Sequence, residues 1–95
     1  MSAYIVAEVE ITDPEGIAAY QRDVLAVVEK FGGRYLVSGG KIVPKEGGWT
    51  PSRLVIVEFP SLEAVESFYE AEEYRELKDL RIRSSNSRFI LADGV

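Results

Sequence analysis

The side chains that could carry chemistry in this chain are carboxylates, guanidinium groups and hydroxyls, because its 95 residues include no His and no Cys. An Arg guanidinium binds a carboxylate or an enolate through two parallel hydrogen bonds. A Glu that loses water in a pocket has a raised pKa and can act as a general base. We therefore predict a pocket at the interface between the sheet and a second copy of the chain, for a small acidic or phenolic molecule, with Glu8 and Glu58 as candidate catalytic bases. The candidate ligand-binding residues are Tyr4, Arg34, Ser38, Trp49, Tyr69 and Arg88.

The same charged residues also have a purely structural interpretation. Glu8 and Glu58 could pair with Arg34 and Arg88 in an interfacial network that fixes the register of a dimer. Trp49 could be a mobile lid over a pocket or, as is common for loop aromatics, an anchor packed on the body of the protein. A closed cavity that contains one of the two arginines and an unpaired polar group would favour a binding site. Complete Glu–Arg pairing without a cavity would favour the network.

Composition and charge narrow the classes of function. The chain is 46% hydrophobic and 28% charged, which is typical of one globular domain. Its net charge of −5 disfavours nucleic-acid binding. The commonest metal ligands are missing, and no glycine pair precedes a helix as a phosphate-binding loop does, so we expect neither a metal nor a cofactor. No apolar run is long enough to span a membrane, and the N-terminus lacks a basic leader, so we expect a cytoplasmic protein.

Hydrophobic periodicity assigns the first half of the chain to a strand, a helix and a strand. Residues 3–11 alternate between two faces, which predicts a strand. Asp13-Pro14 begins a helix, with the Asp as N-cap and the Pro at the first helical position. The helix carries an apolar stripe and ends at Gly32-Gly33, because Gly adopts the left-handed C-cap without strain. Residues 34–38 form a second strand, and the Gly- and Pro-rich residues 40–52 form an exposed loop.

The second half of the chain repeats the pattern. Residues 53–59 predict a third strand, and Ser61 caps a second helix, although Ala64 cannot complete the capping box. Residues 72–83 predict a separate short helix, and Ser87–Ala92 predict the last strand. The order β-α-β-β-α-β indicates a ferredoxin-like α+β fold, with a four-stranded antiparallel sheet and two helices on one face. In the predicted helix over residues 72–83, acidic residues lie toward the start and the basic residues Lys78, Arg81 and Arg83 lie toward the end. This order is typical of a helix that is exposed to solvent.

One face of this sheet would be left without helices. The helix side takes the more apolar set of each strand, which is Ile5, Ala7, Val9, Tyr35, Val37, Val55, Val57, Phe59, Phe89 and Leu91. The other face mixes charge with a patch that is too apolar to meet water. Its residues are Tyr4, Val6, Glu8, Glu10, Arg34, Leu36, Ser38, Leu54, Ile56, Glu58, Arg88 and Ile90. We therefore predict a homodimer in which two such sheet faces meet.

The sequence resembles the domain-of-unknown-function family thirteen-thirty of the dimeric α+β barrel superfamily, over nearly its whole length. The segments that carry the resemblance include Thr12-Asp13-Pro14-Glu15-Gly16, Gly32-Gly33-Arg34-Tyr35-Leu36, Glu58-Phe59-Pro60-Ser61, Glu73-Tyr74 and Ser87-Arg88. Ala71-Glu72 departs from the family pattern, which often has a helix break there. The resemblance implies a ferredoxin-like fold and a homodimeric barrel. Related barrels include cofactor-free monooxygenases and isomerases, so an enzyme of that kind and a non-catalytic dimeric module both stay open beside a ligand-binding protein.

Overall fold

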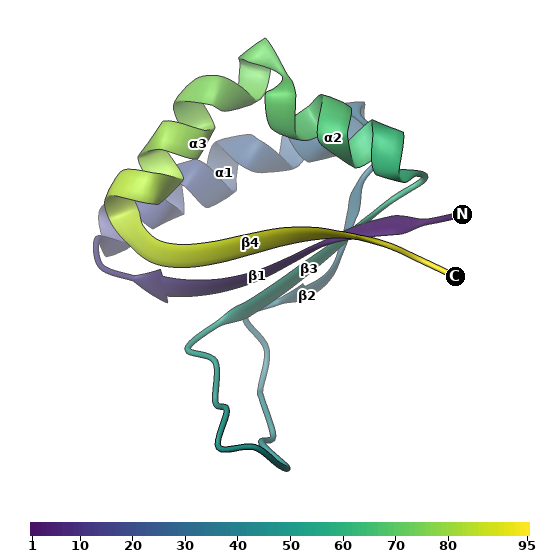
Figure 1. Ribbon diagram of the computed structural model, residues 1–95. Helices are drawn as coiled ribbons and strands as arrows, with labels where there is room; N and C mark the ends of the chain where they lie inside the picture. Colours follow the sequence, from purple (N-terminus) through teal and green to yellow (C-terminus); the bar gives the residue numbers. More distant parts are fainter.

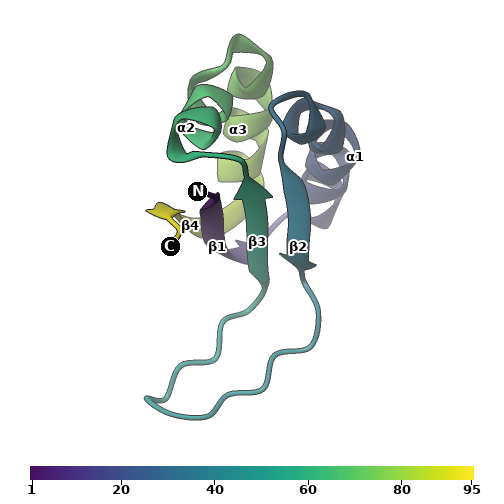
Figure 2. The same cartoon turned by 90° about the vertical axis from the view of Figure 1, so that its right-hand side faces the viewer.

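The computed structural model describes residues 1–95, and its elements follow the predicted order (Figure 1). The sheet is antiparallel with strand order β2-β3-β1-β4, and all helices cover one of its faces (Figures 1 and 2). This is the predicted ferredoxin-like α+β fold. The elements are β1 (Ala3–Ile11), α1 (Pro14–Lys30), β2 (Arg34–Ser38), β3 (Leu54–Phe59), α2 (Leu62–Glu70), α3 (Glu72–Ser84) and β4 (Ser85–Asp93).

The ends of α1 explain how the chain turns from helix to sheet. Asp13 is the N-cap residue and Pro14 lies in the first helical turn, as predicted, but the Asp13 side chain makes none of the expected capping hydrogen bonds. At the other end, Gly32 has a φ of 87°, a conformation that favours Gly. A Cβ on Gly33 would lie 2.7 Å from both the Phe59 ring and Val28, so this position has no room for a side chain.

The helix-like region after β3 is divided into two helices, so three helices cover the sheet instead of the two of the predicted fold. The Ser61 Oγ accepts a hydrogen bond from the Ala64 N–H at 3.0 Å, which confirms the predicted N-cap of α2. Ala71 has extended backbone with φ −66° and ψ 143°, and it separates α2 from α3. None of the three helices is both long and apolar enough to cross a membrane.

The last strand is longer than predicted. β4 begins at Ser85 rather than Ser87, and it continues to Asp93. The Ser84 carbonyl accepts hydrogen bonds from the Thr12 and Asp13 N–H groups at 2.9 and 3.0 Å, and this ties the end of α3 to the end of β1. Pairing with Ile11 therefore starts at Ser85, before the apolar alternation that marks the strand in the sequence. β3 in turn begins at Leu54, one residue later than predicted.

A β-bulge in β2 changes which side chains face the helices. Tyr35 pairs with Val57, but the next pair is Val37 with Ile56, so Leu36 is the extra residue. Directly paired residues of antiparallel strands point to the same face. Val37 therefore lies on the face without helices and Ser38 on the helix side, which is the reverse of the prediction. The helix-side positions predicted for Phe89 and Leu91 are confirmed, because they pair with Ala7 and Ile5.

The core lies between the sheet and the helices. Its largest buried side chains are Tyr74, Phe59 and Phe68. The Phe68 ring centroid lies 4.4 Å from that of Tyr74 and 5.3 Å from that of Phe59, so these three rings form one aromatic cluster. The cluster joins β3 to α2 and α3, and two of its rings, Phe68 and Tyr74, line the space described below.

The segment between β2 and β3, residues 39–53, projects as a long arm beyond the end of the sheet (Figures 1 and 2). The predicted exposed loop is thus confirmed. Trp49 lies on this arm with 58% of its surface exposed, so within one chain it is not anchored on the body of the protein. That exposure contradicts the anchor interpretation of Trp49.

Candidate functional site

The sheet face without helices, hereafter the open face, is organised in rows across the strands. The central row is apolar and reads Val37, Ile56, Val6 and Ile90 from β2 to β4. Ile90 is 60% exposed, and no helix covers the row (Figure 2). The rows on either side carry charge: one reads Leu54, Glu8 and Arg88, and the other reads Arg34, Glu58, Tyr4 and Ala92.

Both acidic residues of the open face are paired with arginines on neighbouring strands. Arg34 Nε donates to Glu58 at 2.8 Å, and Arg88 Nη2 donates to Glu8 at 2.5 Å. The Tyr4 hydroxyl also donates to Glu58, at 3.3 Å. The hydrogen bonds from the arginines hold the pKa of each carboxyl below its usual value. A general base needs a raised pKa, so the shift is opposite to the one that the candidate catalytic role requires.

These two ion pairs predict a specific pH dependence. A carboxyl whose pKa is depressed by folding stabilises the fold above its unfolded pKa of about 4.3, and this contribution disappears as pH falls through the lower folded value. We expect Glu58→Gln to lower the thermal midpoint at pH 7 and to lower it less at about pH 3. Glu66→Gln, on an exposed helical position, is the matched control. A loss of equal size at both pH values would contradict the prediction.

A second space lies on the helix side of the sheet. This inner cavity has a volume of about 50 Å³, enough for a few waters or for part of a small molecule. Most of its lining is apolar, from β1, β3, α1 and α2, and includes Ile5, Val9, Val57 and Phe68. Its polar lining residues carry hydroxyls, an amide and guanidinium groups but no carboxylate, and they are Tyr20, Gln21, Tyr35, Ser38, Arg53, Tyr74 and Arg81.

Arg81 is the unusual member of this lining. It is only 4% exposed, although the sequence predicts a solvated helix here, so that prediction is wrong for Arg81. Its guanidinium stacks on the Phe89 ring, with its carbon 3.9 Å from the ring centroid, and Nη1 donates to Ser87 Oγ at 2.6 Å. Its Nε is buried without any hydrogen-bond partner, and the residue forms no ion pair. A buried cation without a counter-ion is costly for a fold.

Tyrosine hydroxyls lie in the same cavity. The Tyr20 and Tyr74 oxygens are 2.9 Å apart and share one hydrogen bond between α1 and α3. Burial raises the pKa of Tyr20 far above its usual value, and it raises the pKa of Tyr35 to about 12. Both phenols therefore stay protonated at neutral pH, and they can donate hydrogen bonds to a ligand but do not act as bases.

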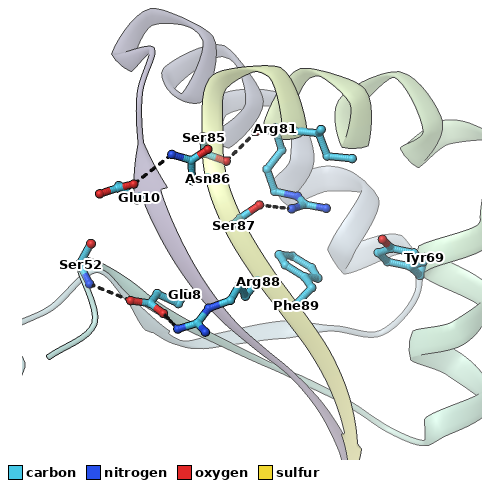
Figure 3. A pocket seen from close by; sticks show the side chains of 11 residues that line it. Glu8, Glu10, Ser52, Tyr69, Arg81, Ser85, Asn86, Ser87, Arg88 and Phe89 are labelled. Carbon is cyan, nitrogen blue, oxygen red and sulfur yellow. Dashed lines mark hydrogen bonds and ion pairs between the residues drawn. The ribbon is translucent and has the colours of Figure 1, made fainter. Parts of the chain in front are cut away.

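On its other side, Arg81 reaches a wide surface depression at the sheet edge. This outer hollow, of about 720 Å³, follows β4 from the open face to the helices (Figure 3). Arg88 and Glu8 line it from the open face, and Arg81 and Tyr69 line it from the helix side. Because Arg81 borders both spaces, it lies between the outer hollow and the inner cavity.

The predicted site residues do not converge on one place. Tyr4, Arg34 and Glu58 meet at one end of the open face, and Glu8 with Arg88 lies two rows away. Tyr69 lines the outer hollow, Ser38 lines the inner cavity, and Trp49 lines neither.

Apart from Ser38, the inner cavity brings together residues that the sequence did not indicate as site residues. The signal for Arg81 was present in its spacing, because Tyr74, Leu77, Arg81 and Ser84 recur at the helical interval on α3. Tyr74, Arg81 and Ser84 are the buried residues of that helix, which shows that Arg81 lies on its inner face.

Comparison with known proteins adds the family and the fold. The family described as Domain of unknown function (DUF1330) matches residues 2–95. No curated protein matches the chain.

Several solved structures share the fold. A protein of unknown function from Rhodopseudomonas palustris, RPA0582, superposes with a TM-score of 0.74 at 23% identity, covering 99% of this chain and 82% of that one. A dimeric protein of unknown function and ferredoxin-like fold from Bacteroides fragilis gives 0.66 at 13% identity, covering 98% and 96%. A dimeric ferredoxin-like protein of unknown function from Jannaschia sp. gives 0.66 at 7% identity, covering 99% and 100%.

Proposed function

The chain belongs to the DUF1330 family, and from this premise we propose that it binds a small organic acid in the inner cavity, with Arg81 as the counter-ion. The observation that carries the proposal is the buried Arg81 guanidinium, whose Nε has no partner in the protein. The proposal keeps the predicted ligand class, a small acidic or phenolic molecule. It moves the site from the open face to the helix side of the sheet.

The chemistry of the lining supports an anion rather than a cation or a neutral ligand. The guanidinium and the tyrosine hydroxyls are hydrogen-bond donors, and no lining residue is acidic. A bound carboxylate or phenolate would supply the missing acceptor for Arg81 and would neutralise its charge. The apolar residues around these donors would cover the carbon skeleton of the ligand.

The same lining favours binding over acid–base catalysis. Tyr20 and Tyr35 have raised pKa values, and the carboxylates that the sequence offered as bases lie on the open face. The cavity can therefore hold an anion, whereas it contains no group that removes a proton at neutral pH.

A thermal-shift series tests the proposal. Carboxylates from acetate to benzoate are compared with their primary amides, which have nearly the same shape and no charge. We expect at least one acid to raise the unfolding temperature and its amide to have little effect, because a ligand that binds only the folded state stabilises it. If no acid raises the midpoint above that of its amide, the proposal fails and the non-catalytic structural module becomes the better interpretation.

We also propose that two copies of the chain pair through their open faces. The apolar row is only partly buried in a single chain, with Ile90 60% exposed, and the charged rows on both sides of it suit a twofold interface. Two of the solved proteins that share this fold are described as dimeric.

A charge in the middle of the apolar row should break this dimer. We expect the unmodified chain to show twice its mass of 10.6 kDa in light scattering and Ile56→Lys to show the single mass. Each chain of the variant would place a lysine in the apolar centre of the interface, where a buried charge is costly. Leu25→Lys, at an exposed apolar position of α1, is the control and should remain dimeric. A single mass for the unmodified chain at micromolar concentration would refute the dimer.

A further inference from the structure

The inner cavity contains a second guanidinium that has no acidic partner. Arg53 lies directly before β3, at the base of the arm, and its side chain lines the cavity. Its Nη2 donates to Ser38 Oγ at 3.2 Å, and it forms no ion pair. Arg53 is partly exposed and Ser38 is exposed, so this end is the mouth of the cavity, whereas Arg81 is buried.

The backbone of the arm holds the Arg53 guanidinium in place. Gly39 has a φ of 74°, and its N–H donates to the Leu54 carbonyl at 3.0 Å. A Cβ at Gly39 would lie 1.9 Å from Arg53 Nη1 and 2.5 Å from its guanidinium carbon. The guanidinium therefore occupies the space that any larger residue at position 39 would fill. A long flexible side chain is thereby seated against the chain instead of extending into solvent.

The two arginines mark different parts of the cavity. Arg53 donates to Ser38 on β2, whereas Arg81 donates to Ser87 on β4, and β2 and β4 are the opposite edge strands of the sheet. The two guanidinium groups thus belong to separate polar ends, and apolar residues such as Val57 and Ile5 line the space with them. One carboxylate at Arg81 would leave the donors of Arg53 without an anionic acceptor.

We infer that the ligand is a small two-headed acid, whose first acidic group binds Arg81 and whose second binds Arg53 at the mouth. The second group is a carboxylate, because an anionic acceptor is what Arg53 lacks. This inference rests on the proposed function, because it assigns the second contact of the same ligand. It makes Arg53 a residue that determines specificity, and it makes Gly39 the residue that positions it.

The test compares succinate with succinamate, which has nearly the same size but only one carboxylate, by isothermal titration calorimetry. Loss of a hydrogen bond to a charged group typically raises Kd by about tenfold or more. We therefore expect succinate to bind at least about tenfold more tightly than succinamate. Arg53→Met should remove this preference, because only the contact with Arg81 remains. Arg22→Met, an exposed arginine on α1, is the matched control and should keep the preference.

A second pair of variants tests the position of the guanidinium without removing its charge. Gly39→Ala should displace Arg53 and weaken the preference, whereas Gly40→Ala should not, because nothing lies within 4 Å of a Cβ there. A tenfold preference that survives in Arg53→Met, or the absence of any preference in the unmodified chain, would overturn the inference while leaving the proposed function intact. If neither compound binds the unmodified chain, and no acid in the thermal-shift series does, the proposed function fails and this inference fails with it.

Discussion

The Arg81→Met variant is expected to lose stabilisation by small acids while unfolding at the same temperature as the unmodified chain, or at a higher one, when no ligand is present. A buried charge without a counter-ion opposes folding, and apolar replacements of buried charged groups are often neutral or stabilising by about 1–4 kcal/mol. Met has a similar length and can pack against the Phe89 ring through its thioether. The same change removes the cation that a bound acid would need.

The expected loss of affinity for acids follows from the charge-assisted hydrogen bond that Arg81 would donate. A charge-assisted hydrogen bond contributes about 1.5–3 kcal/mol, so removal of the guanidinium should weaken binding of a carboxylate by about tenfold to a hundredfold. Thermal shifts with and without the best acid of the series measure both effects in one experiment. Arg83→Met, at an exposed position two residues further along α3, is the control and should change neither quantity.

A structural role for Arg81 would give the opposite pattern. If the guanidinium mainly held β4 through Ser87 and Phe89, its removal should lower the unfolding temperature in the absence of ligand. That result, together with an unchanged response to acids, would contradict the assignment of Arg81 as the counter-ion.

The fold could be predicted from the sequence because its signals are local and repeated. Period-two alternation identifies β1, and the 3.6-residue stripe identifies α1. Gly32-Gly33 and Ser61 mark helix ends by conformations and hydrogen bonds that depend on only a few neighbouring residues. The pairing of Glu8 with Arg88 and of Glu58 with Arg34 then follows from which strands are neighbours.

The site was harder to predict because it depends on register and on packing. The alternation rule assumes that each residue of a strand pairs with one residue of the neighbouring strand. The bulge adds Leu36 as an extra residue, and no distinctive residue type in the sequence marks it. Ser38 therefore faces the helices instead of the open face. Arg81 stands at a helical interval from Tyr74, but an arginine on a charged helix is normally solvated, and only the packed structure shows that α3 presents it to the cavity.

The largest expected loss of stability is that of Phe68→Ala. Phe68 is 1% exposed, contacts Phe59 and Tyr74 in the aromatic cluster, and is one of only two buried residues of α2, with Val65. Truncation of a buried Phe to Ala typically costs about 3–5 kcal/mol, which is a large part of the 5–15 kcal/mol that stabilises most domains. Urea denaturation at one fixed protein concentration measures the change, since a dimer's stability depends on concentration. Leu25→Ala, on the exposed side of α1, should stay within about 0.5 kcal/mol.

The same substitution also separates a binding cavity from a simple packing defect. Phe68 lines the inner cavity, so its truncation should enlarge the space available beside the two arginines. If acids bind there, the variant should be stabilised more by benzoate than by acetate, relative to the unmodified chain, because the larger ring fills the new volume. If the site lay instead on the open face, the Phe68→Ala variant would lose stability but keep the original order of preference among acids. A cost in unfolding free energy without any change in that order would therefore place the ligand outside the inner cavity.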